Sequence, residues 1–297
     1  MKPIVAAITA FLLQLPLAVQ AHDAATGRAT AILNEGVLVE AGDAKVLFDP
    51  IYDRGFNTYP DMDEGLKTQI IEGQAPYDGI DAIFVSHFHG DHFSAPNMLR
   101  LLAAQPKVKL FAPVAAVGAM RKDGGWSEVF AKRITAISLD LDDSTARHSF
   151  DNLLVEAVRV PHSGWPQRHQ DVENIVFRVT LGRDTRVMHL GDAARSTAHF
   201  APHSAFMQAS RTGTAFVPYW MLQPRNEGPR SEGPRNEGSG NLGRDHDPFV
   251  DGVLNAEHAI GIHVPRIVPR ELQASGKDYF DTLGQTRPIP LTPPSTP

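Results

Sequence analysis

Cysteine is absent from this chain of 297 residues. Without thiols the chain forms no disulfide bonds, so its core must be stable without covalent cross-links. The absence of thiolates also excludes iron–sulfur clusters and zinc fingers built on cysteine ligands. Any metal site in this protein must therefore use imidazole nitrogens and carboxylate oxygens.

The sequence has no surplus of basic residues either. It carries 28 Lys and Arg against 34 Asp and Glu, a net charge of −6, and no block of like charge. Surfaces that bind nucleic acid or anionic lipid need clustered Lys and Arg, which disfavours both classes of partner. The hydrophobic content of 42% is ordinary for a globular protein. We therefore expect a small-molecule substrate and no nucleic-acid partner.

Long apolar runs are missing except at the N-terminus. Lys2 precedes "IVAAITAFLLQLPLAV", and "VQA" at residues 19–21 places small residues at the two positions that a signal peptidase recognises. The run is shorter than the roughly 20 apolar residues that span a bilayer, and Pro16 interrupts it, so a membrane anchor is the weaker interpretation. The pattern predicts a signal peptide over residues 1–21, cleaved after Ala21. We expect an exported protein, periplasmic or secreted, with no stable membrane insertion once the signal is removed.

Residues 22–297 are expected to form a single α/β domain. "GVLVEAGDAKVLFDP" predicts a hairpin, and the apolar run at 82–85 predicts a buried strand. "APNMLRLLAAQ" has the apolar spacing of a helix. Further strands are predicted at "KVKLFAP", "RITAISL", "LLVEAVRVPH", "NIVFRVTLG", "TRVMHLGD", "TAFVPYW" and "AIGIHVP". Strands mixed with helices along the whole chain predict sheet layers covered by helices.

One segment differs from the rest of the domain. Residues 223–245 repeat Pro-Arg-x-Glu-Gly with a five-residue period and contain a single apolar residue, Leu242. Such a segment cannot bury enough apolar area to offset the entropy lost on ordering. Its arginines and glutamates also cancel in charge. We expect a disordered surface loop.

Histidines are crowded in "FVSHFHGDHF", residues 84–93, although only 13 residues of the chain are histidine. Four metal-ligating side chains lie there: His87, His89, Asp91 and His92. A chain that leaves a buried strand enters a loop, where side chains converge at the sheet edge instead of alternating between its faces. Gly90 permits the tight turn that this convergence needs. The cluster therefore predicts a metal site.

The string "HFHGDH" resembles the His-x-His-x-Asp-His signature of the metallo-β-lactamase superfamily. The family pattern continues with a histidine after a later strand, for which "VRVPHSGW" offers His162. It next requires an aspartate after a strand and a glycine, and "VMHLGDA" offers Asp192. A last histidine ends a late strand, and "AIGIHVP" offers His263. The resemblance implies a four-layer αββα sandwich, in which helices cover two mixed β-sheets.

The same resemblance implies two cation positions that share Asp192. Three imidazoles form the first position: His87, His89 and His162. The second position combines a carboxylate with two imidazoles: Asp91, His92 and His263. Three neutral imidazoles suit zinc with one open coordination position. The carboxylates of the second position leave manganese and iron as alternatives for the two divalent ions.

Other histidines compete with these ligands. His246 and His258 are alternatives to His263, which is favoured because it follows apolar alternation at a strand end, whereas His258 is expected to precede that strand. His189, on the strand before Asp192, is expected in the core or beside the ligands. His148 is expected in a turn.

Together these features predict an exported binuclear metal-dependent hydrolase. Two cations ~3.5–4 Å apart activate a bridging hydroxide for attack on a lactone, ester or phosphodiester. Asp91 is the catalytic candidate that accepts or returns the proton. "GVLVEAGDAKVLFDPIY" and the pair "VPHSG" and "HLGDA" are similar to the branch of ascorbate-phosphate lactonases and N-acylphosphatidylethanolamine-hydrolysing phospholipases. A β-lactamase-type amide hydrolase and a non-hydrolytic metal-binding or di-iron redox protein of the same fold stay open as alternatives.

Substrate selection must come from loops around the metals. Five aromatic residues are candidates for an apolar rim: Tyr52, Phe56, Trp165, Tyr219 and Trp220. Arg168 and Arg195 are candidates for holding a phosphate or carboxylate group, although nothing in the sequence selects them.

Overall fold

The computed structural model describes residues 27–223 and 247–292. The expected signal peptide and nearly all of the expected repeat loop lie outside these ranges, so both stay predictions. Within the described ranges, no helix combines the length and the apolar character that crossing a membrane requires.

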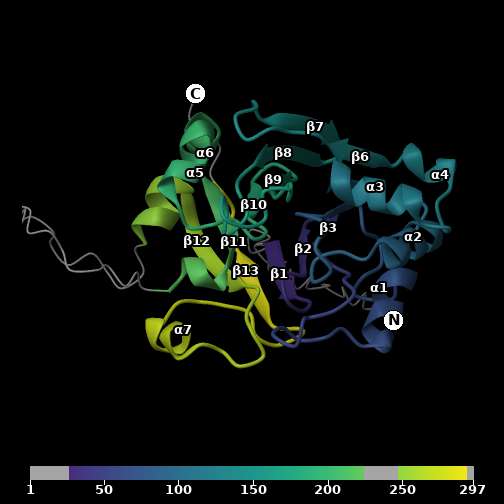
Figure 1. Cartoon of the computed structure of the whole chain (residues 1–297), viewed down its shortest axis with the longest axis horizontal. Coiled ribbons are helices and arrows are strands. Elements are labelled where there is room, and N and C mark those ends of the chain that lie inside the picture. Colours follow the sequence, from purple (N-terminus) through teal and green to yellow (C-terminus); the bar gives the residue numbers. More distant parts are fainter. Residues whose placement is uncertain (1–26, 224–246, 293–297) are drawn as a thin grey trace, which may run out of the picture.

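The described strands form two mixed β-sheets (Figure 1). The first sheet has seven strands in the spatial order β13 (Thr286–Ile289), β1 (Gly27–Ala31), β2 (Val37–Ala41), β3 (Ala44–Phe48), β4 (Ala82–Phe84), β5 (Lys109–Pro113) and β6 (Ile134–Ile137). The second has six in the order β12 (Ala256–Ile262), β11 (Thr212–Pro218), β10 (Thr185–His189), β9 (Ile175–Leu181), β8 (Leu153–Arg159) and β7 (Ala146–Phe150). Strands β3 to β6 run parallel, as do β10 to β12, and the remaining pairs are antiparallel.

Helices cover the outer face of each sheet (Figure 1). Beside the first sheet lie α1 (Glu64–Glu72), α2 (Ala95–Ala104), α3 (Val114–Lys122) and α4 (Glu128–Ala131). Beside the second lie α5 (Thr197–Phe200), η1 (Ala201–His203), α6 (Ser204–Ala209), η2 (Tyr219–Met221), η3 (Phe249–Val253) and α7 (Arg270–Ser275). Helix α1 shows why these segments are helical, because Asp63 caps its first turn and Gly73 ends it in the left-handed region.

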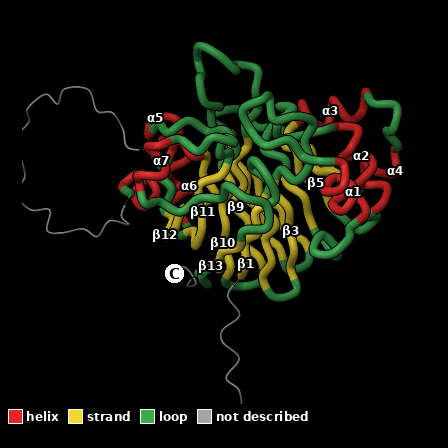
Figure 2. Tube along the Cα trace, turned by 90° about the horizontal axis from the view of Figure 1, so that it is seen from below, coloured by secondary structure: helices red, strands yellow, loops and turns green. Residues whose placement is uncertain are grey.

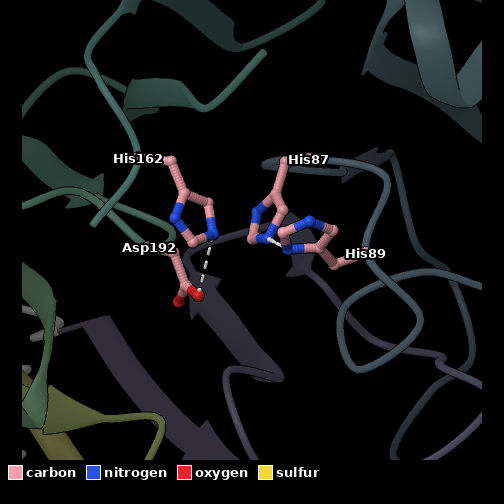
Figure 3. Close-up of side chains that lie close together, drawn as sticks. All are labelled: His87, His89, His162 and Asp192. Carbon is pink, nitrogen blue, oxygen red and sulfur yellow. Dashed lines mark hydrogen bonds and ion pairs between the residues drawn. The ribbon is translucent and has the colours of Figure 1, made fainter. Parts of the chain in front are cut away.

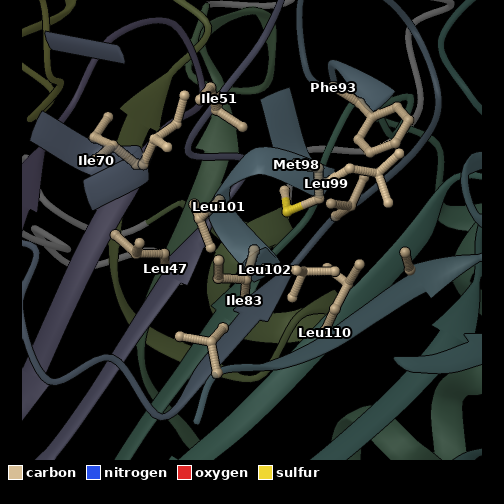
Figure 4. Close-up of a cluster of buried hydrophobic side chains, with 14 of the residues drawn as sticks. Leu47, Ile51, Ile70, Ile83, Phe93, Met98, Leu99, Leu101, Leu102 and Leu110 are labelled. Atoms are coloured by element: carbon tan, nitrogen blue, oxygen red, sulfur yellow. The ribbon is translucent and has the colours of Figure 1, made fainter. Parts of the chain in front are cut away.

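Alternation along the strands separates three layers of core. In β3, Leu47 packs against the helices, whereas Phe48 packs between the two sheets. In β4, Ile83 faces the same helix layer, where it joins residues such as Met98 of α2 (Figure 4). In the second sheet, Phe177 lies between the sheets. The expected four-layer αββα sandwich is confirmed.

The segments with the metal-ligating motifs follow the ends of four strands. The His-x-His-x-Asp-His loop follows β4, and the segments with His162, Asp192 and His263 follow β8, β10 and β12. Figure 2 shows loops gathered over one edge of the two sheets, with helices on either side. Because parallel strands end at a common edge, residues far apart in the sequence meet there.

Two local predictions were wrong, and one strand was missed. His148 lies within strand β7, not in a turn, because Ala146–Phe150 pairs with β8 at the edge of the second sheet. Strand β12 begins at Ala256, so His258 is part of the strand instead of preceding it. Strand β13 was not expected at all; it pairs with β1 at the sheet edge, where Pro288 is tolerated.

Candidate metal centre

The loop after β4 curls into one tight turn. The backbone amides of His92 and Phe93 both donate to the carbonyl of His89, at 3.0 and 2.9 Å. The Gly90 carbonyl accepts the amides of Asp53 and Arg54, which ties the turn to the segment after β3. This curl directs His87 and His89 to one side of the centre and His92 to the other.

The first group of ligand atoms comprises His87, His89, His162 and Asp192, all within 4.8 Å of one another (Figure 3). His87 Nε2 lies 3.1 Å from His89 Nδ1. His162 Nε2 lies 3.2 Å from Asp192 Oδ2. The segments that carry His162 and Asp192 are joined directly, because the Ser163 amide donates to the Asp192 carbonyl at 2.6 Å.

The second group lies on the other side of Asp192. His92 Nε2 is 3.1 Å from His263 Nε2. Asp192 Oδ1 is 3.2 Å from His263 Nε2 and 3.5 Å from His92 Nε2. Asp91 Oδ2 is 3.5 Å from His263 Nε2. The seven side chains expected from the sequence are therefore all brought together, with Asp192 between the two groups.

These side chains fit the divalent cations that the family pattern implies. Nitrogen atoms of two imidazoles approach each other at 3.1 Å in both groups, a spacing that a common cation would satisfy. His162 Nε2 and Asp192 Oδ1 are buried without a hydrogen-bond partner within the described chain. Buried polar atoms are rarely left unpaired, so these atoms are consistent with ligation. The donor set of imidazole and carboxylate is also one that zinc, manganese and iron accept.

The electrostatics of the two groups differ. Burial, together with neighbouring His162 and His92, lowers the pKa of His89 to about 4, so its imidazole is neutral at physiological pH. Burial also lowers the pKa of His87. Burial opposes charge on His92 as well, but Glu35 and Asp192 raise its pKa well above the usual value. In the first group, His87 and His89 thus favour the neutral imidazole, whereas the surroundings of His92 in the second group favour positive charge.

Two buried residues orient the ligands from behind. Asp49, at the end of β3, accepts the Ser86 amide at 2.7 Å and lies 3.0 Å from His92 Nδ1. An acceptor on Nδ1 fixes the tautomer whose Nε2 is free to bind a cation. On the other side, Asn174 Oδ1 accepts the Asp192 amide at 2.9 Å. These contacts hold the ligand loops to the sheet ends.

Glu35 is a buried residue that the sequence interpretation missed. It lies in the turn between β1 and β2, and its carboxylate belongs with His92, Asp192 and His263 in a group whose ligand atoms lie within 4.8 Å of one another. Burial is the main cause that raises its pKa above the usual value. In the sequence, Glu35 looked like an ordinary turn residue before an apolar run, and no local signal distinguished it.

The aromatic rim differs in part from the expectation. Tyr52 is fully buried in the core, and its hydroxyl donates to the Pro60 carbonyl, so this rim prediction was wrong. Tyr59, which was not expected, presents its ring edge-on to His263 with 3.9 Å between ring centroids. Trp220 lies 5.4 Å from the His263 ring, and the tip of Phe56 lies beside the Gly90 turn. The rim is therefore built next to the second group.

Two polar residues considered in the sequence analysis, Arg195 and His189, contact the protein framework and lie outside the two ligand groups. Arg195 is ion-paired with Asp247 and donates to the Met221 carbonyl, so it is part of the framework. His189 is buried, stacks on Phe48 and lies with Nε2 3.1 Å from the Glu35 carbonyl, as a core role requires.

Two further histidines differ in their distance from the ligand groups. His258 is exposed on β12 and lies outside the metal-ligand groups, which leaves His263 as the last ligand candidate among the described residues. The ring of His169 lies close to the first group, 4.4 Å from that of His162.

Comparisons with known proteins agree with this architecture. A family model described as "Beta-lactamase superfamily domain" matches residues 44–263. A search of curated proteins gave no match. The chain is similar to Igni18, a metallo hydrolase from Ignicoccus hospitalis KIN4/I, at 13% identity, with 89% of this chain and 99% of that chain covered and a TM-score of 0.53.

Two further solved structures share the fold. An isothiocyanate hydrolase from Delia radicum gut bacteria is 15% identical, with 88% of this chain and 99% of that chain covered and a TM-score of 0.53. CmlA, a diiron β-hydroxylase from Streptomyces venezuelae, is 14% identical, with 89% of this chain but 54% of that chain covered and a TM-score of 0.51. The expected superfamily and its class, metal-dependent hydrolases, are confirmed, while the finer branch stays a prediction. The chain belongs to the family of β-lactamase superfamily domains.

Proposed function

We propose that this protein is an exported, binuclear metal-dependent hydrolase that cleaves a lactone, ester or phosphodiester. The observation that carries the proposal is the position of Asp192, whose Oδ2 lies 3.2 Å from His162 and whose Oδ1 lies 3.2 Å from His263. One carboxylate thus faces both groups of ligand atoms. An arrangement of this kind suits two cations held side by side.

Each position has its own donor chemistry. The three imidazoles of the first suit zinc, and the lowered pKa values of His87 and His89 mean that these two release few protons on binding. A di-iron redox centre is disfavoured because the first position contains only imidazoles besides the shared Asp192. When bound, two divalent cations supply a nucleophilic water at neutral pH and polarise the electrophilic oxygen of the substrate.

The protein supplies the remaining parts of the reaction. Asp91 lies beside the second group, 3.5 Å from His263 Nε2, and we assign it the transfer of a proton from the attacking water to the leaving group. Tyr59 and Trp220 flank His263 and offer an apolar wall for the organic part of the substrate. The signal-like N-terminus supports export, and the net charge of −6 supports a small-molecule substrate over nucleic acid.

Activity measurements on the purified zinc-loaded protein test this function. The panel contains lactones, phosphodiesters, carboxylic esters and the β-lactam nitrocefin, and isothiocyanates are added because a hydrolase of the same fold acts on them. We expect turnover of a lactone, ester or phosphodiester that is lost after chelation. Turnover of nitrocefin alone would instead support the β-lactamase alternative.

A pair of variants, one on strand β12 and one just after it, separates catalysis from folding. His263→Ala should lose turnover, whereas His258→Ala should retain it, because His258 is exposed and lies outside the ligand groups. Equal activity of the two variants, or turnover that survives complete metal removal, would contradict the proposed function.

A further inference from the structure

Glu35 is a buried carboxylate that the ligand set described above leaves without a role. Its side chain is fully buried, and neither Oε1 nor Oε2 has a hydrogen-bond partner within the described residues. Burying a carboxylate without a donor or a cation is strongly unfavourable. A residue kept in this state therefore calls for a positive partner.

The turn that carries Glu35 is anchored to the ligand loops. The Asn34 carbonyl accepts the His263 amide at 2.9 Å, and Asn34 Nδ2 donates to the Asp91 carbonyl at 2.7 Å. The Glu35 carbonyl accepts His189 Nε2 at 3.1 Å. The position of the turn is thus set by the same segments that present the metal ligands.

The carboxylate of Glu35 points to the second group. Its Oε2 lies 3.4 Å from His92 Nδ1, and its ligand atom lies within 4.8 Å of those of Asp192 and His263. Asp49 Oδ2 is closer to the same nitrogen, at 3.0 Å, and already provides the acceptor that orients His92. Glu35 has only the longer contacts with His92 Nδ1 at 3.4 Å and His189 Nε2 at 3.9 Å, so its carboxylate adds acidic character beside the second group.

We propose that Glu35 is an additional acidic residue of the second cation position and stabilises the ion bound there. The inference rests on the binuclear centre proposed above. With Glu35 the second position has three carboxylates and two imidazoles, whereas the first has three imidazoles and the shared Asp192. Oxygen-rich sites favour manganese and iron relative to imidazole-rich sites. Glu35 should therefore matter more for Mn²⁺ than for Zn²⁺ at the second position.

The test is Glu35→Gln, which removes the charge and keeps the size of the side chain. Binding of Zn²⁺ and of Mn²⁺ to the full mature chain is measured by chelator competition and elemental analysis. The matched control is Glu156→Gln, which neutralises another buried carboxylate, ion-paired with Arg178 away from the ligand groups. Melting temperatures of metal-free and metal-loaded proteins are recorded for both variants.

We expect Glu35→Gln to weaken the second ion by at least about 10-fold, with a larger loss for Mn²⁺, and to change the first by less than about 2-fold. The metal-free variant should melt close to the wild type, because without an ion the buried carboxylate has no hydrogen bond and only contacts of 3.4 and 3.9 Å with His92 and His189. Glu156→Gln should lower the melting temperature in both states and leave both affinities unchanged.

Two outcomes would overturn the role of Glu35. The first is that Glu35→Gln binds both ions with wild-type affinity. The second is that Glu35→Gln loses as much stability without metal as with metal, which a purely structural residue would give. If the wild type itself binds a single ion, the result contradicts the binuclear centre on which the role of Glu35 rests. The measurement on the wild type therefore separates the two failures.

Discussion

Asp49→Asn tests how the fold prepares His92 for a cation. In the wild type, the buried Asp49 carboxylate accepts the Ser86 amide at 2.7 Å and lies 2.5 Å from Ser86 Oγ and 3.0 Å from His92 Nδ1. Asparagine has one acceptor oxygen, which can still serve the Ser86 amide, and the Ser86 hydroxyl can turn to accept. The NH₂ group then faces Nδ1–H of His92, and this donor loses its closest partner and keeps only Glu35 Oε2 at 3.4 Å.

The magnitude follows from that single lost contact. A buried hydrogen bond to a charged group contributes about 1.5–3 kcal/mol, so the free energy of unfolding should fall by that amount. If the imidazole instead changes tautomer, the proton moves to Nε2 and blocks the nitrogen that faces the second cation position. Either response should weaken the second ion by about 10–100-fold. Urea denaturation gives the first quantity, and chelator competition gives the second.

Asp81→Asn provides the control. Asp81 is half-buried and accepts the Lys45 amide at 2.9 Å, a contact that the asparagine oxygen can keep, and it lies outside the ligand groups. We expect little change in stability and none in metal affinity for this variant. If Asp49→Asn binds the second ion as tightly as the wild type and unfolds at the same urea concentration, the orienting role assigned to Asp49 is wrong.

Four further changes have expected outcomes. His89→Ala should abolish binding at the first position and most turnover, seen by elemental analysis and kinetics; full metal occupancy would contradict this. Asp192→Ala should weaken both ions, and loss of only one would show that the carboxylate is not shared. Gly191→Ala should cost at least about 1–2 kcal/mol, because Gly191 has φ +52° and an added Cβ would lie 2.5 Å from Asn174 Oδ1; unchanged melting would refute this. Deleting residues 225–238 should leave activity and melting temperature unchanged, whereas a large loss of stability would make the repeat part of the fold.

Much of the centre could be predicted because its ligands have local signals. The cluster from His87 to His92 is contiguous, so its chemistry is visible without any fold. His162, Asp192 and His263 each follow an apolar run, and the common edge of the sheets is where such runs end. The three-layer core was predictable for the same reason, because buried strands and amphipathic helices have distinct apolar periods.

What could not be predicted depends on tertiary contacts. Glu35 and Tyr59 reach the centre only because their loops are held against the segment after β12, through the His263 amide and through Arg266, which donates to the Tyr59 carbonyl at 2.7 Å. Strand β7 has few apolar residues because it lies at a sheet edge, and Tyr52 resembles any loop aromatic until its burial is known. These features follow from where distant segments meet, and no short stretch of sequence encodes them.

Crystallographic anomalous scattering at the zinc edge tests the central claim most directly. For the zinc-loaded protein, we expect two peaks about 3.5–4 Å apart, one beside His87, His89 and His162 and one beside His92 and His263, with Asp192 between them. A single peak, or peaks away from Asp192, would contradict the two-cation centre.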